Sequence, residues 1–281
     1  MRIVRTTAEV RALVADARSR GEVVGLVPTM GAFHDGHLSL IRRAHADGGL
    51  VVVSLFVNPT QFGANEDLSA YPRDEARDAD LAREAGADIL FAPAVDEVYP
   101  DGFATSIHVS GITEVMCGAV RGAQHFDGVA TVVAKLFGMI APDAAYFGQK
   151  DAQQIVVVRR LVRDLDIPVR IVACPIVREA DGLAMSSRNV YLDDGARAQA
   201  TALNRALTAA ETVVRAGTTD AATVLAAAHA ELAASGIGPE YVELRTPDDL
   251  QTVDNVDRPT LLAIAARVGR ARLIDNRILE P

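Results

Sequence analysis

Two histidines stand three residues apart in PTMGAFHDGH, which spans Pro28 to His37. An apolar run, Val23 to Val27, precedes this stretch, and the LSLIRRAHADGG that follows it is typical of a helix. A buried strand that leads through a glycine turn into a helix is where α/β proteins bind phosphate. Imidazoles at that point can donate hydrogen bonds to a triphosphate, or carry positive charge as pyrophosphate leaves. We therefore expect His34 and His37 to act on a phosphate-bearing substrate.

The competing interpretation of His34 and His37 is a pair of surface or capping histidines, because two histidines at this spacing are common by chance. The surrounding turn favours function over that reading. Gly36 has no side chain, so a phosphate could approach the backbone closely there.

A second glycine turn, GQKD from Gly148 to Asp151, lies between an expected short strand and an expected helix. Lys150 would lie at the carboxyl end of that strand, within reach of phosphates held by the first turn. The alternative is structural: Asp151 and Gln154 have the spacing of a capping box, which would leave Lys150 a solvated turn residue. Both interpretations stay open, and Asp151 could cap the helix and bind the ligand together.

The segment MSSR, Met185 to Arg188, follows Asp181 and Gly182 where the chain crosses from the first expected domain to the second. Taken alone, it is more typical of an ordinary polar turn. Two hydroxyls followed by an arginine would nevertheless hold phosphate oxygens well, and a segment at a domain junction could close over a nucleotide.

Neutral amides stand at two further element ends. Asn58 and Gln61 follow an apolar strand, and Gln154 lies at a helix start. Asn-Pro favours turns, so Asn58 and Gln61 could be no more than turn residues. As ligand contacts, these amides would orient a hydroxyl and a carboxylate without adding charge to an anionic site.

Asp78 lies on an expected charged helix, which favours a solvated surface position. If a metal were held there, a carboxylate that contacts Mg²⁺ mostly through waters would suffice.

The elements that must position these residues alternate between strand and helix over the first part of the chain. Alternation of this kind indicates an α/β fold with a parallel, doubly wound sheet. Strands are expected at 23–27, 50–57, 88–92, 145–147 and 169–174, with helices from Thr6 or Thr7 to 21, from about His37 to 47, and at 73–85, 129–140 and 155–165.

The pattern changes after about Val177, where helices are followed by a run of strands. A long helix capped by Asp193 and ending at Arg215 precedes a second helix at 219–234 and strands at 241–244, 260–268 and 271–279. We therefore predict two domains: residues 1–177 form the nucleotide-binding and catalytic domain, and residues 178–281 form a small α+β lid domain.

Charge and composition limit the function classes. Lys and Arg total 28 against 37 for Asp and Glu, a net charge of −9, which argues against a general nucleic-acid binder. The two cysteines, Cys117 and Cys174, are far apart, so reduced thiols and no structural zinc are expected. No signal peptide and no membrane-spanning apolar stretch is recognised, so we expect a soluble cytoplasmic protein.

Taken together, the motifs resemble those of the pantothenate synthetase family over essentially the whole chain. The strings that carry the resemblance, in order, are PTMGAFHDGH, SLFVNPTQFG, YPRD, HFDGVATVVAKL, YFGQKDAQQ, READGLAMSSRN and YVELR. The resemblance implies a Rossmann-like nucleotidylyltransferase domain of the HxGH superfamily, related to class I aminoacyl-tRNA synthetases, with a small C-terminal domain. MSSR then looks like the counterpart of the mobile KMSKS loop, and the family implies cytoplasmic homodimers that need Mg²⁺.

By the same resemblance, the reaction is ATP-dependent amide formation in two steps. The carboxylate of (R)-pantoate attacks the α-phosphate of ATP, which gives pantoyl adenylate and pyrophosphate. The amine of beta-alanine then attacks the acyl carbon, and AMP and pantothenate, a precursor of coenzyme A, are released. His37 matches the family residue usually given the proton-donor role, and His34, Lys150 and Arg188 complete the expected catalytic set.

The resemblance also assigns the ligand contacts. Gln61 and Gln154 match the pantoate-binding glutamines, Gln61 also lies near beta-alanine, Asn58 and Tyr71 fall in the same lining, and Asp78 matches a carboxylate linked to Mg²⁺. The positions that match the ATP contacts are Met30, Gly31, Ala32, Phe33, His34, Asp35, Gly36, His37, Gly148, Gln149, Lys150, Asp151, Val177, Met185, Ser186, Ser187 and Arg188.

Three positions depart from the family pattern. Arg77 stands where relatives often carry another acid beside Asp78, which weakens the expected metal contact. RPGHF reads RGAQHF here, so the approach to His125 is expected to differ in shape. KDYQQ reads KDAQQ, and the loss of the aromatic ring should alter packing more than chemistry.

Two other function classes share parts of this pattern. A related nucleotidylyltransferase could pass AMP to a phosphate-bearing acceptor, but it would need cations where Asn58, Gln61 and Gln154 offer amides. A nucleotide-binding regulator could have kept the fold without catalysis, but the intact HxGH, GQKD and MSSR segments argue against that.

Overall fold

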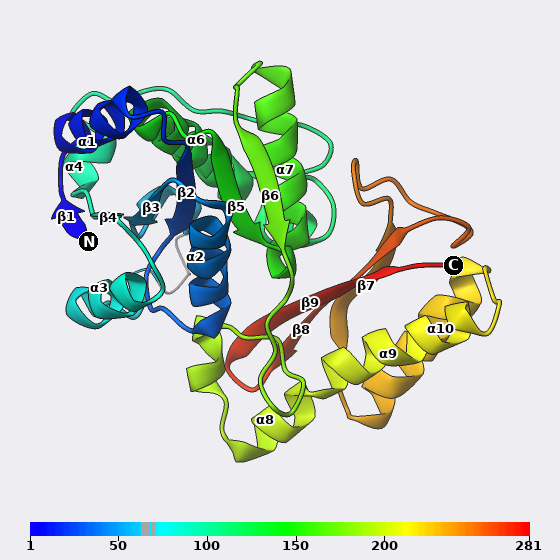
Figure 1. Ribbon diagram of the computed structural model, residues 1–281. Coiled ribbons are helices and arrows are strands. Elements are labelled where there is room, and N and C mark those ends of the chain that lie inside the picture. Colours follow the sequence, from blue (N-terminus) through cyan, green and yellow to red (C-terminus); the bar gives the residue numbers. More distant parts are fainter. Residues whose placement is uncertain (63–67, 69–70) are drawn as a thin grey trace.

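Six parallel strands form the larger of two sheets in the computed structural model, which describes residues 1–62, 68 and 71–281 (Figure 1). Their order across the sheet is β1-β4-β3-β2-β5-β6. The chain builds outward from β2 to β3 and β4, then returns to the other side of β2 with β5 and β6. The reversal between β2 and β5 opens a crevice at the carboxyl ends of the strands, where doubly wound sheets bind ligands. The strands span Arg2–Val4, Val24–Thr29, Leu50–Leu55, Ile89–Phe91, Ala144–Gly148 and Arg170–Cys174.

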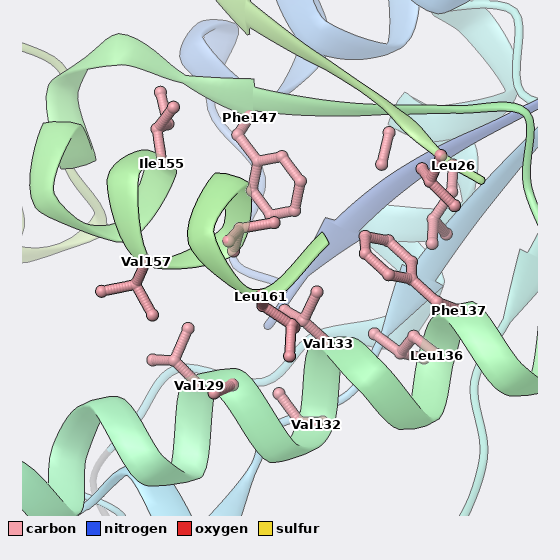
Figure 2. Close-up of a cluster of buried hydrophobic side chains, with 14 of the residues drawn as sticks. Leu26, Val129, Val132, Val133, Leu136, Phe137, Phe147, Ile155, Val157 and Leu161 are labelled. Carbon is pink, nitrogen blue, oxygen red and sulfur yellow. The ribbon is translucent and has the colours of Figure 1, made fainter. Parts of the chain in front are cut away.

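Helices cover both faces of this sheet, because successive strand residues point to opposite sides. On one face, Leu26 and Phe147 pack with the apolar residues of α1 (Thr7–Ser19), α6 (Ala123–Ile140) and α7 (Ala152–Asp164). On the other face, Val27 and Tyr146 pack against α2 (Asp35–Asp47) and α3 (Glu75–Glu84). Figure 2 shows the first of these clusters, where Leu26 and Phe147 lie among side chains of α6 and α7. The predicted Rossmann-like, doubly wound sheet is confirmed.

The smaller sheet is antiparallel and consists of β7 (Pro239–Arg245), β8 (Thr260–Val268) and β9 (Ala271–Leu279) in that order. Its central strand buries both faces. Leu262 and Ile264 pack in the core formed with α8 (Asp194–Ala200), α9 (Ala202–Arg215) and α10 (Ala221–Ala234). Leu261 and Ala263 instead join the core of the large sheet. The predicted C-terminal α+β unit is therefore present and is packed directly onto the first unit, while its division at residues 177 and 178 stays a prediction.

Most expected elements are confirmed within a few residues, and their local causes are visible. Thr6 caps α1 in a capping box with Glu9. The expected helix from Asp193 to Arg215 is interrupted after Ala200, where the Thr201 hydroxyl bonds the Ala198 carbonyl at 2.8 Å. Short elements were missed, because three to five residues carry too little pattern to detect: β1, α4 (Val95–Val98), α5 (Cys117–Arg121), η1 (Pro59–Gln61), η2 (Gln149–Asp151) and η3 (Ser187–Tyr191).

Two expectations from composition concern the cysteines and the membrane. Cys117 and Cys174 are both free, as predicted, and both are buried. Over the described ranges, the helices lack the length and apolarity needed to cross a bilayer.

Candidate active site

The loop after β2 delivers both histidines to the crevice at the switch point of the sheet. His34 is the N-cap of α2, and its Nδ1 accepts the Gly36 N–H at 3.1 Å. In the neutral ring the proton therefore lies on Nε2. A Cβ on Gly36 would lie 2.8 Å from the His34 ring, so a glycine at this position leaves the room that the imidazole needs. The sequence interpretation, in which Gly36 clears space for a phosphate, omitted that packing role.

Asp78 holds this loop from α3. Its Oδ2 accepts the Ala32 N–H and its Oδ1 accepts the Phe33 N–H, each at 2.8 Å, and the residue is only 1% exposed. Gly31 and Ala32 have positive φ angles of 88° and 54°, a conformation that a non-glycine residue adopts only when it is held. The expectation of a solvated surface position for Asp78 is wrong, because the β2 loop folds over the first turn of α3. Its metal contact stays a prediction.

The two imidazoles are in contact, with ring centroids 4.2 Å apart and ring planes tilted by 40°. Burial, and then the charge of Lys150, lower the pKa of His34 to about 4. Burial, and then His34 and Lys150, lower the pKa of His37 to about 3. Within the described residues the buried Nδ1 of His37 has no hydrogen-bond partner. Both rings are therefore neutral at pH 7 before ligand binds, which favours donation from a neutral N–H over a standing positive charge.

The turn after β5 brings Lys150 to the other side of the same crevice. The Lys150 side chain is 21% exposed, and its Nζ lies 3.7 Å from the Asp151 carboxylate. Asp151 is the N-cap of α7, but its side chain makes no capping hydrogen bond. The capping-box interpretation is therefore wrong, and Lys150 is not a freely solvated turn residue. Gln154 lies one turn further along α7 and faces the crevice.

A short hairpin presents the MSSR segment. Val177 and Met185 are joined by a backbone hydrogen bond of 3.0 Å, and Gly182 at the tip has a φ of 89°. Ser186 caps η3 by accepting the Arg188 N–H. The Asn189 side chain donates to Glu179 at 2.6 Å and so ties the far end of the segment back to the hairpin. These hydrogen bonds hold the MSSR segment in one conformation at the end of the hairpin. An ordinary polar turn would not need so many contacts.

A cavity of about 210 Å³ lies between the three segments and collects most of the predicted site. Seven predicted residues do not line it: Gly31, Ala32, Phe33, Asp35, Gln149, Asn58 and Asp78. The predicted residues that do line it are Met30, His34, Gly36, His37, Gln61, Tyr71, Gly148, Lys150, Asp151, Gln154, Val177, Met185, Ser186, Ser187 and Arg188.

Asn58 lies behind the cavity and holds Gln61. It is 1% exposed, and its Nδ2 donates to Gln61 Oε1 at 2.9 Å and to the Gly128 carbonyl at 3.1 Å. Its Oδ1 accepts the Tyr99 hydroxyl at 2.8 Å. The Asn58 amide is thus used within the protein, which corrects its expected role as a substrate contact. Because Gln61 Oε1 is occupied by Asn58, the NH₂ group of Gln61 is left to donate.

His125, in the altered RGAQHF loop, also supports Gln61. Its Nδ1 lies 2.9 Å from the Gln61 backbone carbonyl, so this nitrogen carries the proton. The Arg121 guanidinium lies 2.9 Å from the opposite ring nitrogen, Nε2. The RGAQHF loop therefore contacts the cavity wall through His125 and Gln61.

Sequence reasoning missed the apolar wall of the cavity. Val129, Val132, Val133 and Leu136 of α6 line it together with Phe147, and Figure 2 shows these side chains projecting from α6 and β5. The helical spacing of α6 was recognised, but a face that packs in a core and a face that lines a site have the same apolar pattern. The sequence carries no signal that separates the two.

Comparisons with known proteins identify the family of this chain. The family model for pantoate-beta-alanine ligase matches residues 2–278. Pantothenate synthetase of Moorella thermoacetica is 52% identical over 284 residues, which cover 100% of this chain and 99% of that protein. A crystal structure of pantothenate synthetase from Thermus thermophilus has a TM-score of 0.95 at 48% identity, with 100% of both chains covered. A Francisella tularensis pantoate-beta-alanine ligase, complexed with beta-gamma ATP and beta-alanine, has a TM-score of 0.79 at 31% identity, covering 99% of this chain and 97% of that one. The chain therefore belongs to the pantoate-beta-alanine ligase family.

Proposed function

We propose that this chain joins pantoate to beta-alanine with ATP in two steps within the 210 Å³ cavity. In the first, a pantoate carboxylate oxygen attacks the α-phosphorus, the bond to pyrophosphate breaks, and pantoyl adenylate forms. In the second, the beta-alanine nitrogen attacks the acyl carbon, AMP leaves, and the nitrogen loses a proton to water. The observation that carries this proposal is the meeting of cationic and N–H donors with two neutral amides in one cavity.

The phosphate end of the cavity would be formed by His34, His37, Lys150 and the MSSR segment. A carboxylate that attacks a polyphosphate meets repulsion, so donors must neutralise charge as it moves onto pyrophosphate. Lys150 and Arg188 supply positive charge in this role. Because burial keeps both imidazoles neutral, His34 would donate through Nε2–H, and His37 as a neutral N–H donor rather than as an imidazolium.

The nucleotide would lie along the two glycine turns, where Gly36 and Gly148 line the cavity. Backbone N–H groups at the start of α2 favour a phosphate there. Val177 and Met185 would contact the nucleotide from the hairpin side.

The pantoate end would be formed by Gln61, Gln154 and the apolar wall. The Gln61 NH₂ group can donate to the carboxylate or a hydroxyl, and the Gln154 side chain makes no hydrogen bond within the described part of the chain. The two methyl groups on the central carbon of pantoate suit the valines and Leu136 of α6. Tyr71 lines the same end, and Gln61 would also face the beta-alanine amine.

Mg²⁺ would arrive with the nucleotide as MgATP. The described residues offer no cluster of three or more His, Cys, Asp or Glu side chains that could hold a metal ion by itself. Asp78 is only 1% exposed and both its oxygens already accept backbone N–H groups, so a contact between this carboxylate and Mg²⁺ would run through water. A preformed metal site is therefore not part of the proposal, and the phosphates would supply most of the ligands.

The two alternative functions fit the cavity less well. An adenylyltransferase with a phosphate-bearing acceptor would need cations where Gln61, Gln154 and the apolar α6 wall lie. A nucleotide-binding regulator could use Lys150 to hold phosphate, but it would not need Gln61, Gln154 and the apolar α6 wall beside the phosphate end.

The expected oligomeric state and cellular location rest on the family resemblance alone. We propose a cytoplasmic homodimer, and light scattering during size-exclusion chromatography tests the dimer by giving about twice the chain mass of 29.8 kDa.

The direct test of the proposed reaction measures pyrophosphate and AMP release from MgATP, with each substrate omitted in turn. Pantoate alone should give a single-turnover burst of pyrophosphate. AMP and a product with the mass of pantothenate should follow only when beta-alanine is added. Folded protein that shows no pantoate-dependent turnover would reject the ligase, and other acceptors would then be screened.

A further inference from the structure

Two consecutive residues of β9, Asp275 and Asn276, are buried polar side chains that the proposed mechanism does not use. They are 2% and 3% exposed. Asn276 donates from Nδ2 to the backbone carbonyls of Gln149 and Lys150, both at 2.9 Å. The last strand of the chain therefore holds the turn that carries Lys150.

The Asn276 amide is committed to this turn. An asparagine Nδ2 has two N–H donors, and each is used on a different carbonyl. The two carbonyls belong to the peptides on either side of the Lys150 Cα, so the backbone position from which the lysine side chain extends is fixed. A lysine is a compact charge on a flexible stem, and its reach is set by where its backbone lies.

Asp275 holds a second phosphate-facing segment. Its carboxylate accepts hydrogen bonds from the two terminal guanidinium nitrogens of Arg178, at 2.6 and 2.9 Å. Arg178 also donates to the Gly182 carbonyl at 3.1 Å, which closes the hairpin that leads to MSSR. The Asp275 carboxylate further accepts the Asn276 N–H at 2.8 Å, so the two anchors are joined. Alternation along the strand lets neighbouring residues reach opposite sides.

We propose that the Asp275–Asn276 pair is a positioning element for adenylation, and that Asn276 acts through Lys150. The inference rests on the proposed function, because Lys150 must stabilise charge on the nucleotide. The pair fixes the Lys150 turn and the MSSR hairpin to one rigid strand and so sets their separation. A shift of about 1 Å in a group that binds the transition state can cost about 100-fold in rate.

The first experiment compares Asn276→Ala with wild type in pantoate-dependent pyrophosphate release. We expect kcat/KM for ATP to fall by about 10- to 100-fold. Arg277→Met is the matched control, because Arg277 is the next residue of β9 but bonds Asn204 and Glu211 of α9. The control should adenylate pantoate at the wild-type rate. An Asn276→Ala variant that is as fast as this control would overturn the proposal.

A double-mutant cycle separates positioning from general damage. In a Lys150→Ala background, Asn276→Ala should slow adenylation by less than about 2-fold, because the group it positions is already gone. The same fold loss with and without Lys150 would mean that Asn276 supports the structure alone. Asn276→Ser, which keeps one donor, is measured in parallel and should fall between Ala and wild type, so the test survives if the alanine variant does not fold.

The second half-reaction gives a further discriminating measurement. Adenylate is accumulated on the variant during a long incubation with pyrophosphatase, and beta-alanine is then added. Aminolysis should keep its wild-type rate, since pyrophosphate has already left. If wild type itself releases no pyrophosphate with pantoate, the proposed function fails; if only the variant comparison fails, the positioning role fails.

Discussion

The two turns at the switch point of the large sheet are held in opposite ways. The turn after β2 is held through its backbone N–H groups, by a carboxylate of α3 in the same layered unit. The turn after β5 is held through its backbone carbonyls, by an amide of β9 in the second sheet. The first presents two neutral imidazoles, and the second presents the cationic Lys150.

The two turns therefore depend on different parts of the chain for their positions. The anchor of the β2 turn, Asp78, is 45 and 46 residues from its partners, whereas Asn276 is 126 and 127 residues from its own. The imidazole side can therefore be complete within the first unit. The lysine side is complete only when the second sheet is packed against it, which couples the positive charge to the C-terminal unit.

The largest expected effect is on the lysine side. Lys150→Ala should lower the rate of adenylation by about 100- to 1000-fold, a loss of the size found when a group that stabilises transition-state charge is removed. Its unfolding free energy should change by less than about 1 kcal/mol, since Lys150 makes only a weak ion pair. Pyrophosphate release and urea unfolding measure the two effects. Lys135→Ala, which removes the other lysine of the sequence, is the control. A variant inactivated in proportion to its unfolding would contradict the charge role.

The imidazole side should instead respond in stability when its anchor is removed. Asp78→Ala leaves two backbone N–H groups without their charged acceptor, which should lower the unfolding free energy by about 3 kcal/mol. Asp80→Ala on the same helix is the matched control, because Asp80 forms a surface ion pair with Arg83 and its loss should cost under about 0.5 kcal/mol. Equal denaturation midpoints for the two variants would mean that Asp78 does not hold the loop.

Lowering the pH should reduce the unfolding free energy through the imidazole side, which is the third and a smaller expected effect. The folded pKa of His37 is about 3 against an ordinary 6.5, so between these values the unfolded chain binds a proton that the folded protein refuses. Stability from this residue is complete above pH 6.5 and falls as pH drops toward 3. At pH 5 the loss is about 2 kcal/mol, and His37→Gln should be spared it. Unfolding at pH 7.5 and 5 checks this, with His229→Gln on α10 as control. An unchanged pH dependence in His37→Gln would show that the ring is not held neutral.

The smallest expected effect lies outside both turns. Gln61 follows β3 and is proposed to donate a hydrogen bond to pantoate. Gln61→Ala should therefore raise KM for pantoate about 10-fold, roughly the cost of one hydrogen bond, and should leave KM for ATP near wild type. Initial rates at varied pantoate and varied ATP measure both constants. A rise in KM for ATP alone would move Gln61 from the pantoate end to the phosphate end.

Local pattern was sufficient for much of the fold. Continuous apolar runs predicted β2 and β3 because strands covered on both faces have that composition. The edge strand β6 was also expected, although Arg170 interrupts its apolar residues. The end residues of β8 and β9 were predicted as observed, at Thr260, Val268, Ala271 and Leu279. The same pattern predicted where His34, Lys150 and Gln61 would gather, since the carboxyl ends of parallel strands share one edge.

Local pattern could not reveal which residues serve the site from behind. The sequence pattern predicts a surface position for Asp78 and a ligand contact for Asn58, yet both residues are buried and hold neighbouring segments. A side chain's helix or strand position says which way it points, but not which distant backbone will be there to meet it.

The sequence by itself determined the alternation of elements, the family and the segments at which the chemistry gathers. Each of those is a property of neighbouring residues or of a whole matched chain. Only the tertiary structure decided that Asn276 grips the Lys150 turn, that Asp78 grips the histidine loop and that the histidines are neutral. Those features depend on burial and on partners far away in sequence, and packing alone brings them together.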